Sequence, residues 1–520
     1  MNYSDLFRAT LPETALEVAA LAVLVFDLGF LRKAALQTRV AVASLLGVAG
    51  CIVAIWGVYA AGNAGFSVND GLLLTAGGIT SAAQIGILVL TALTLLLLVE
   101  ERFTKHAGEY VAVVLMAAAG GLIISAAQDL LVIFIGLELL SLGLYILTAF
   151  AKKSGKSAEA AIKYYLFGGM SAAFLLFGFS YLYGLTGSTS LQEIYYAVGR
   201  AGSAPLVYVA WILIVAGLGF KVAAVPFHLW APDTYEGAPA PAAAFIASVS
   251  KVASFTLLIN VCVNVFNVGA FEGQRDAIIR WLHAYYATGA RLGGVLLIVA
   301  AASMVVGNLA ALAQSSVRRL LAYSAIAHAG YMLLGVAVRA SNFDAFNQGD
   351  SILAFYRSQM VSANAVLYYI LTYGLTTIGA FGVVSVVERA TGSDRLDSFL
   401  GLHKRNPLLA AVLLVLFLSL AGIPPLVGFW AKFNLFAAVL NVGAGPVPFA
   451  LVALAIAMSA VSLYYYLQVL KRAYVMHAAD ESPIKAGPIS TLVLVAIAAA
   501  VVLMGCFPSL LQDWIASFYS

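Results

Sequence analysis

Residues 129–150 read DLLVIFIGLELLSLGLYILTAF, an apolar run from Leu130 onward that holds one acidic residue, Glu138, near its centre. A helix needs about 20 apolar residues to cross the hydrocarbon of a bilayer, so this stretch predicts a transmembrane helix. The whole chain has the same character, with 62% hydrophobic residues, 10% charged residues and a mean hydropathy of +0.97. A soluble domain carries about a quarter of its residues charged. Most of the surface is therefore expected to face lipid.

Long apolar runs, bounded by charged residues or by glycine and proline, predict an all-α integral membrane protein with about fourteen transmembrane helices. Residues 271–286 mix charges with Trp281 and Tyr285 and are expected to form an interfacial helix instead. The spans are expected near residues 13–31, 40–61, 72–99, 109–127, 129–150, 160–186, 205–229, 240–268, 292–314, 319–338, 361–387, 407–437, 447–470 and 488–507.

The loops on alternate sides of these spans differ in charge. Most lysines and arginines of the loops fall on one side, and the positive-inside rule makes that side cytoplasmic. An even number of spans then places both termini on the outer side of a bacterial inner membrane. Asp27 lies close in sequence to Arg32 and Lys33, which favours a local ion pair at the cytoplasmic edge.

Four lysines remain inside the predicted spans. An ionisable group at mid-membrane costs at least about 2.5–3.5 kcal/mol and usually marks an ion or proton path. Arginine stays charged in any environment, whereas a desolvated lysine can lose its proton, so lysines suit a path that loads and unloads protons. Glu138 could serve the same path or only hold helices together in an ion pair. The lysines are Lys163, whose stem could also snorkel to the cytoplasmic surface, Lys221, Lys251 and Lys432.

Two of these lysines lie beside prolines that should interrupt their helices. Lys221 precedes Pro226 by five residues, and Lys432 follows Pro424 and Pro425. A proline frees the carbonyl four residues earlier, and in a membrane such a break persists only where protein or a water-filled cavity covers it. Paired breaks in two halves of a chain are typical of inverted-repeat transporters and their ion sites, although a packing kink is the alternative. The freed carbonyls are expected at Val222, Leu420 and Ala421.

Further polar residues have two interpretations each. His228 and His328 could relay protons through their two ring nitrogens, or could be buried and satisfied by a neighbouring hydroxyl. Asp233 and Glu236 follow the first break and could guard a cytoplasmic opening or cap a loop. The tyrosine run 464–466 is interpreted as part of an aromatic belt at the membrane boundary.

Several motifs are absent from the sequence. It has no phosphate-binding loop, no dinucleotide fingerprint and no cysteine or histidine spacing typical of a metal or cluster. We therefore expect no metal or cofactor in this chain and no nucleic-acid partner. A proton path without an energy source of its own has to be driven by a partner or by a second ion gradient.

With these residues assembled, the sequence resembles the N subunit of respiratory complex I, the proton-pumping NADH-quinone oxidoreductase. The resemblance runs from about residue 100 to 475, and the block PFHLWAPDTYEGAP at 226–239 is its most specific part. The other stretches that carry it are IGLELLSL, SAEAAIKYYLFG, LDSFLGLHKRNPLLA and LSLAGIPPLVGFWAKF.

The resemblance implies two inverted five-helix repeats with broken helices, and it implies roles for individual residues. Glu138 and Lys221 would form a charge pair, Lys251 would connect the halves, His328 would relay, and Lys432 would lie on the exit side. Lys163, His228 and Asp233 are further relay candidates. NAD, FMN, iron–sulfur clusters and quinone are expected in partner subunits, and adjacent antiporter-like subunits are expected as neighbours.

The expected organisation is an N-terminal three-helix segment (1–105), a first repeat (106–270), a second repeat (271–476) and a C-terminal helix (477–520). Within the resemblance, the segments near 265–291 and 340–360 look longer than usual. Two other functions remain open on the sequence alone. The chain could be a stand-alone or Mrp-type cation/proton antiporter subunit, or a scaffold that keeps its lysines as ion pairs.

Overall fold

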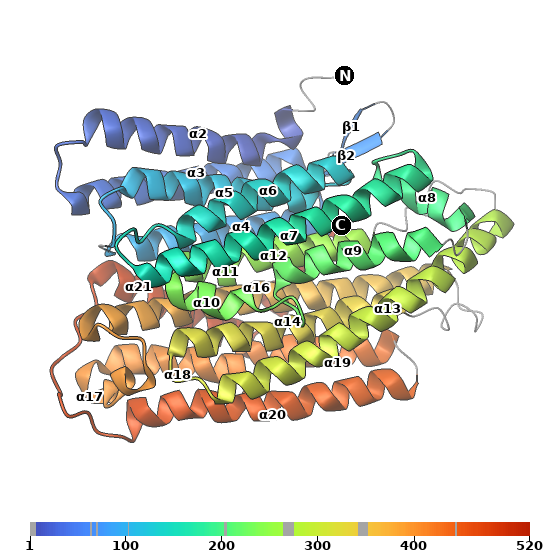
Figure 1. Cartoon of the computed structure of the whole chain (residues 1–520). Helices are drawn as coiled ribbons and strands as arrows, with labels where there is room; N and C mark the ends of the chain where they lie inside the picture. The colour runs from blue at the N-terminus through green and yellow to red at the C-terminus, as the bar shows by residue number, and fades with distance from the viewer. Residues whose placement is uncertain are drawn as a thin grey trace.

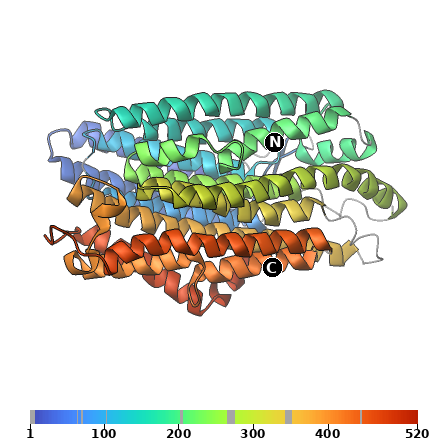
Figure 2. The same ribbon diagram turned by 60° about the horizontal axis from the view of Figure 1, so that its bottom comes forward.

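The computed structural model describes residues 7–62, 65–68, 71–101, 103–201, 205–263, 275–341, 352–442 and 445–519. Long helices lie side by side along one axis, and the turned view shows the same alignment (Figures 1 and 2). The N-terminal helices form one edge of the bundle and α20 lies at the opposite edge in Figure 1. A two-stranded antiparallel hairpin, β1 (Gly65–Val68) and β2 (Gly71–Thr75), is the exception among the described residues.

Twelve helices of the described part of the chain are long and apolar enough to cross a membrane. The bundle consists of α2 (Leu11–Val25), α3 (Leu36–Ala61), α4 (Gly78–Leu98), α5 (Ala107–Ala126), α6 (Leu130–Thr148), α7 (Gly155–Thr186), α8 (Leu191–Ala201), α9 (Pro205–Val222), α10 (Trp230–Gly237), α11 (Ala240–Ala247), α12 (Val249–Val263), α13 (Arg275–Leu312), α14 (Val317–Ser341), α16 (Ile352–Thr391), α17 (Leu402–Arg405), α18 (Pro407–Ala421), α19 (Val427–Val442), α20 (Pro446–Tyr474), α21 (Pro488–Cys506) and α22 (Ser509–Ala516).

The predicted spans correspond to these helices. Two of them are not among the twelve: α2, which continues as a π-helical turn at Phe26–Phe30, and the interrupted pair α18 and α19. Both predicted breaks are present, because α9 ends before Pro226 and α18 ends before Pro424. The peptide bonds preceding Pro226 and Pro425 are cis.

Two boundaries predicted from the sequence are wrong. The span expected from residue 72 begins with strand β2, and its helix starts only at Gly78. The segment 271–286 is not a separate helix, since from Arg275 onward it is the first part of the 38-residue helix α13. The charged residues of this segment do not interrupt the helical hydrogen bonding, so the segment continues directly into the membrane-spanning part of α13. Residues 264–274 and 342–351, within the two segments expected to be long, lie outside the described residues.

Small residues allow α5 and α6 to approach closely. A Cβ atom on Gly120 would lie 2.5 Å from the backbone nitrogen of Leu140, and one on Gly143 would lie 2.7 Å from Cβ of Ala117. Helices in lipid gain little from the hydrophobic effect, so close van der Waals contact through glycine is a main source of their association. Asp129 caps the start of α6 by accepting a hydrogen bond from the Leu131 N–H at 2.8 Å. These contacts hold α6, and therefore Glu138, at a fixed height in the bundle.

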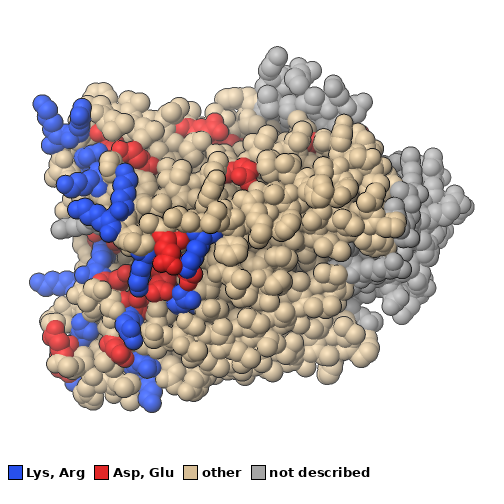
Figure 3. All heavy atoms as spheres, in the orientation of Figure 1, with Lys and Arg blue, Asp and Glu red and all other residues tan. Residues whose placement is uncertain are grey.

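Lysine and arginine side chains gather at one end of the molecule (Figure 3). We call this end the basic face. It is formed by the loops that join α4 to α5, α6 to α7, α13 to α14, α16 to α18 and α20 to α21. The middle of the molecule is almost free of exposed charge in the same view, as expected for a surface in contact with hydrocarbon.

Candidate functional site

Lys221 and Glu138 are brought together by α9 and α6. Lys221 lies in the last turn of α9 and is buried, with 7% of its surface exposed. Its Nζ donates a hydrogen bond to Oγ of Ser141, which lies one turn after Glu138 on α6. Glu138 is half-buried and acts on the charge of Lys221, although none of the ion pairs among the described residues joins the two. Ser141 therefore links Lys221 to α6, and its own hydroxyl donates to the Leu137 carbonyl.

The break beside Lys221 is held by side chains from other elements. The indole Nε1 of Trp230 donates to the Phe220 carbonyl at 2.9 Å, and Oγ of Ser303 on α13 accepts from the Val225 N–H at 2.9 Å. The ring of Trp230 is stacked on Tyr164 of α7, with centroids 4.3 Å apart. The interruption is thus a built feature, covered by protein as a break in a membrane helix has to be.

Lys432 binds the backbone at the second break, between α18 and α19. Its Nζ donates to the Ala421 carbonyl at 2.8 Å and to Oγ of Ser459 on α20 at 2.7 Å. The prediction that the Ala421 carbonyl needs a partner outside its helix is confirmed. The ammonium also lies over the ring of Tyr331, 5.5 Å from its centroid. The lysine that the sequence places near the break is therefore directly bonded to the backbone that the break exposes.

Lys251 lies in the centre of the molecule, on α12. Only 1% of its surface is exposed, and its Nζ donates to the Ala325 carbonyl on α14 at 2.5 Å. The ammonium lies 5.8 Å from the ring centroid of Tyr373 on α16. No carboxylate forms an ion pair with Lys251 among the described residues. Burial without a counter-ion raises the free energy of the charged form of this lysine. Such an environment suits a group that releases its proton.

His328 connects the surroundings of Lys251 to those of Lys432. It lies one turn after Ala325 on α14, and the charges of both lysines act on it. Its Nδ1 is 2.8 Å from the hydroxyl of Tyr369 and its Nε2 is 3.4 Å from that of Tyr466.

A cavity of about 10 Å³ lies between His328 and the second break, lined also by Ser419 and Gly428. This space suits about one water molecule. A proton could pass through this region by way of hydroxyl groups and water.

Lys163 and Asp233 belong to a different group of charges, at the basic face. The Lys163 ammonium contacts Glu159 at 2.7 Å and Asp233 at 2.8 Å, and its side chain is 40% exposed. Asp233 and Glu236 also bind Arg319, at 2.6 Å and 3.0 Å. This network ties α10 to α7 and α14. Lys163 therefore reaches the basic face, as the snorkelling alternative expects, and its role as a relay stays a prediction.

His228 stands apart from these contacts. It is half-buried in the first break, and its buried Nδ1 has no hydrogen-bond partner among the described residues. The structure brings Glu138 to Lys221, and Lys251 to His328 and Lys432, but it does not bring His228 into either group.

Sequence reasoning missed four side chains that connect these groups: Ser141, Tyr369, Tyr466 and Ser459. The interpretation of residues 464–466 as an aromatic belt is wrong for two of them, because Tyr465 and Tyr466 are buried and only Tyr464 is exposed. The helical period of α20 turns these two rings inward. The spacing of Tyr466 and Ser459, seven residues or two turns apart, was the signal that could have placed both on one face.

The expected partners of Asp27 are also wrong. Asp27 is buried, and its carboxylate binds Arg39 of α3 in bidentate fashion, at 2.7 Å and 2.6 Å. It also accepts from the Gly108 N–H. The reason is the π-helical turn at Phe26–Phe30, which directs Asp27 into the bundle and away from Arg32 and Lys33.

The network around Asp233 predicts a pH-dependent stability. Burial alone would raise the pKa of Asp233, but the hydrogen bonds from Lys163 and Arg319 outweigh it and lower the pKa. The ionised carboxylate thus stabilises the native state at neutral pH, and this stabilisation is lost as the pH falls through the lowered pKa. We expect a contribution of about 1 kcal/mol, because the side chain is partly exposed and solvent screens it.

The measurement is thermal unfolding in detergent between neutral pH and about pH 3. Asp233→Asn should lower the midpoint at neutral pH and make it less dependent on pH. Asp513→Asn, at an exposed position of α22, is the matched control. An unchanged pH dependence in Asp233→Asn would contradict the assignment.

The fold and the site together define a class of protein. Membrane-spanning helices interrupted beside buried lysines, with an ionisable path between two breaks, are the arrangement of an antiporter-like subunit that moves ions across a membrane. The family described as NADH:quinone oxidoreductase/Mrp antiporter, TM, matches residues 127–272 and 276–459, more than half of the chain. The chain belongs to this family, and it is a multi-pass membrane protein.

Individual relatives agree with this assignment. The NADH-quinone oxidoreductase subunit N 2 of Acidobacterium capsulatum is 46% identical over 525 residues, which cover 99% of each chain. The NADH-quinone oxidoreductase subunit N 1 of Roseiflexus castenholzii is 38% identical over 84% of this chain and 78% of its own length.

A chain of respiratory complex I from Thermus thermophilus with bound aureothin superposes with a TM-score of 0.74 at 31% identity, covering 96% of this chain and 98% of that one. A chain of the Mrp complex from a Dietzia species shares the fold alone, with a TM-score of 0.73 at 20% identity over 98% of this chain and 96% of that one.

Proposed function

We propose that this chain is a proton-translocating membrane subunit of an NADH-quinone oxidoreductase, and that it moves protons from the cytoplasm to the outside. The proposal rests on a series of ionisable groups across the bundle, all of which are buried except Glu138, which is half-buried. Glu138 and Lys221 lie at one end, Lys251 and His328 at the centre, and Lys432 at the other end. Each is linked to a hydroxyl group, a carbonyl or a neighbouring charge, as a proton relay requires.

The energy comes from partner subunits. The two relatives from Acidobacterium capsulatum and Roseiflexus castenholzii are named as subunits of NADH-quinone oxidoreductase, so we assign this chain to such a complex. NAD, FMN, iron–sulfur clusters and quinone belong to the partner subunits in this proposal. Adjacent antiporter-like subunits contact apolar sides of the helix bundle. Quinone reduction in a distant subunit drives the proton transfer.

The first half works through the pair of Glu138 and Lys221. While Glu138 is ionised, its negative charge favours the ammonium form of Lys221. If a partner subunit neutralises Glu138 or draws it away, the ammonium remains in a medium of low dielectric. The proton then leaves towards Lys251 and onward to Lys432. Ser141 accepts a hydrogen bond from the Lys221 ammonium and so holds it against α6.

The proposal also assigns the two ends of the bundle to the two sides of the membrane and divides the chain into two repeats. By the positive-inside rule the basic face is cytoplasmic and both termini lie outside. The two breaks support a division into a first repeat (106–270) and a second repeat (271–476), preceded by the segment 1–105 and followed by 477–520. Lys163 and Asp233 are then at the cytoplasmic face, where they anchor α10 and could deliver protons to the first half.

The experiment compares two preparations in liposomes. The assembled complex should acidify one compartment on addition of NADH and quinone, without need for sodium. The purified chain alone should show no sodium-dependent proton flux, since its path is lined by lysines and a sodium site needs oxygen ligands. Sodium-driven flux by the chain alone would replace this proposal by a stand-alone antiporter.

A scaffold role gives a different outcome in the same assay. The double variant Glu138→Gln, Lys221→Gln removes both charges and leaves no uncompensated partner. If the charges only hold helices together, the assembled complex with this variant pumps normally. We expect its pumping to be lost.

A further inference from the structure

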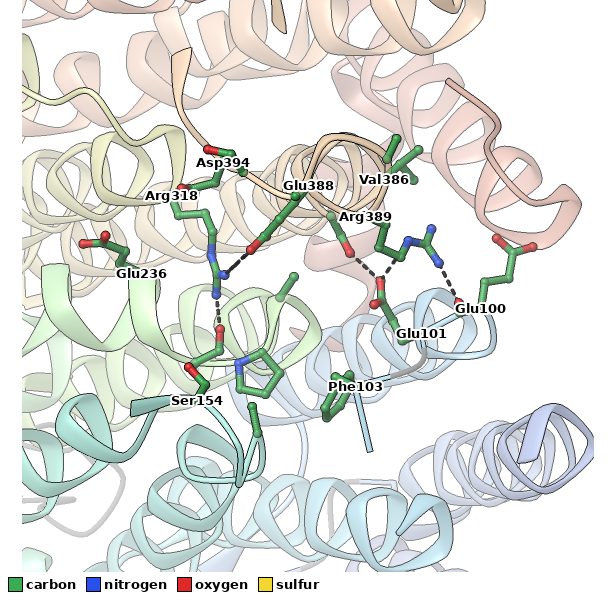
Figure 4. A pocket seen from close by; sticks show the side chains of 18 of the residues that line it. Glu100, Glu101, Phe103, Ser154, Glu236, Arg318, Val386, Glu388, Arg389 and Asp394 are labelled. Carbon is green, nitrogen blue, oxygen red and sulfur yellow. Dashed lines mark hydrogen bonds and ion pairs between the residues drawn. The ribbon is translucent and has the colours of Figure 1, made fainter. Parts of the chain in front are cut away.

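A large cavity opens at the basic face, outside the path described above. Its volume is about 1280 Å³, and its wall is formed by α3, α7, α10, α14 and α16 together with the loops after α4 and before α21 (Figure 4). It lies where the N-terminal segment meets both halves of the chain.

Charges of both signs line this cavity in equal number among the described residues. Arg318 pairs with Glu388, and Lys156 pairs with Glu236. A wall without net charge does not suit an anionic ligand such as phosphate, whereas it suits water and protons. The acidic residues are Glu100, Glu101, Glu236, Glu388 and Asp394, and the basic ones are Lys156, Arg318, Arg389, Arg395 and Lys485.

Glu101 differs from the other carboxylates because it lies at the inner end of the cavity. Its side chain is only 9% exposed. It accepts a hydrogen bond from the Ser385 hydroxyl and lies 3.7 Å from Arg389 (Figure 4). Burial raises the pKa of the Glu101 carboxyl, and the Arg389 guanidinium opposes this shift. The other groups that face it are Glu100 on its own segment, Glu388 of α16, Arg318 of α14 and Tyr110 of α5.

A second, small cavity continues inward from Glu101. It has a volume of about 10 Å³, enough for about one water molecule, and it shares Glu101, Ser385 and Arg389 with the large cavity. Its inner lining includes Ala244 of α11 and Phe381 of α16. Water that enters from the basic face can thus reach beyond the Glu101 carboxylate.

Polar residues lead from this small cavity to the central lysine. Ser248 lies one helical turn beyond Ala244, and Thr377 lies one turn inward of Phe381; both are buried. The next turn of each segment brings Lys251 and Tyr373, whose ring lies 5.8 Å from the Lys251 ammonium. The remaining distance along the helices is about 11 Å, or two turns. α4, α12 and α16 meet here, because a Cβ on Gly374 would contact Leu90, Ser248 and Val252.

We infer that Glu101 and the two cavities form a second cytoplasmic inlet, which delivers protons to Lys251 without passing Lys221. Glu101 takes up a proton from water in the large cavity and releases it inward, and the hydroxyls of Ser248 and Thr377 and intervening water carry it to Lys251. This inference rests on the proposed function, since it requires that Lys251 transfers protons.

The test uses Glu101→Gln in the assembled complex in liposomes, with NADH oxidation and proton uptake measured together. Glutamine still accepts from Ser385 but cannot carry the proton, so we expect the ratio of protons to electrons to fall by the share of protons that enters through Glu101. Glu481→Gln, an exposed carboxylate at the same face, is the matched control and should leave the ratio unchanged. An unchanged ratio in Glu101→Gln overturns the inlet.

Arg389→Gln separates proton uptake from a structural role of the ion pair. Proton uptake through Glu101 should decline as the cytoplasmic pH rises above the pKa of its carboxyl. Without the guanidinium that opposes burial, this pKa rises further, so the decline should move to higher pH. A uniform loss at every pH, or no change, overturns the inlet even if Glu101→Gln fails to assemble.

The outcome can be told apart from a failure of the proposed function. Loss of pumping in Lys221→Ala with normal pumping in Glu101→Gln removes only the second inlet. Normal pumping in both variants removes the proposed function itself.

Discussion

Replacing Lys221 by alanine is expected to abolish the proton transfer that starts at the pair of Glu138 and Lys221, while the complex still assembles. Lys221 is the buried base at the end of α9, and its Nζ contacts Ser141 beside Glu138. Alanine removes the group that takes the proton and leaves Glu138 without the positive charge that it faces. A positioned proton-transfer group contributes about 10²–10⁴-fold to its step, so the loss at this step should be at least about a hundredfold.

The measurement is NADH-driven proton uptake in liposomes that contain the assembled complex, with subunit content checked after purification in mild detergent. Lys404→Ala is the matched control, because this lysine pairs with Glu481 at the exposed basic face. The control should pump as the unsubstituted complex does. Undiminished uptake in Lys221→Ala, with the complex intact, would remove Lys221 from the path.

The positions of the helices and of their interruptions could be predicted from the sequence because they depend on local properties. An apolar run long enough to cross the bilayer has few alternatives to a helix, since its backbone groups have to be satisfied within the segment. Pro226 and Pro424 interrupt their helices for an equally local reason, the missing N–H. The high cost of burying a charge made Lys221, Lys251 and Lys432 conspicuous in the same way.

The contacts between these residues could not be predicted, because they depend on which helices pack together. Ser141 and Ser459 are ordinary small residues in apolar helices, and only the crossing of α6 with α9, and of α19 with α20, gives them a lysine as partner. Tyr466 resembled a membrane-boundary residue until the packing of α20 placed its hydroxyl near His328. Asp27 has nearby cations in sequence but binds Arg39 in space. The large cavity beside Glu101 gives no sequence signal, since its wall comes from five helices.

Lys432→Arg tests whether the second break needs a lysine that can lose its proton or only a positive charge. Arginine could still donate to the Ala421 carbonyl and to Ser459, the two partners that Lys432 holds at 2.8 Å and 2.7 Å. Its guanidinium, however, does not deprotonate in a protein. We therefore expect Lys432→Arg to assemble and to lose at least about a hundredfold in proton release, the same loss that we expect of Lys432→Ala.

The assay is again proton uptake against NADH oxidation, with Lys471→Arg at an exposed position of α20 as the matched control. If Lys432 only satisfied the carbonyl at the break, arginine would restore pumping that alanine removes. Restored pumping would thus assign Lys432 to the stability of the break, and the path would have to leave the protein elsewhere. Loss in both variants, with the control unaffected, means that the proton itself resides on the Lys432 amine before it is released. The break at Pro424 and Pro425 then has a chemical purpose, because it presents a backbone carbonyl that stabilises the charged form of that amine until the proton leaves.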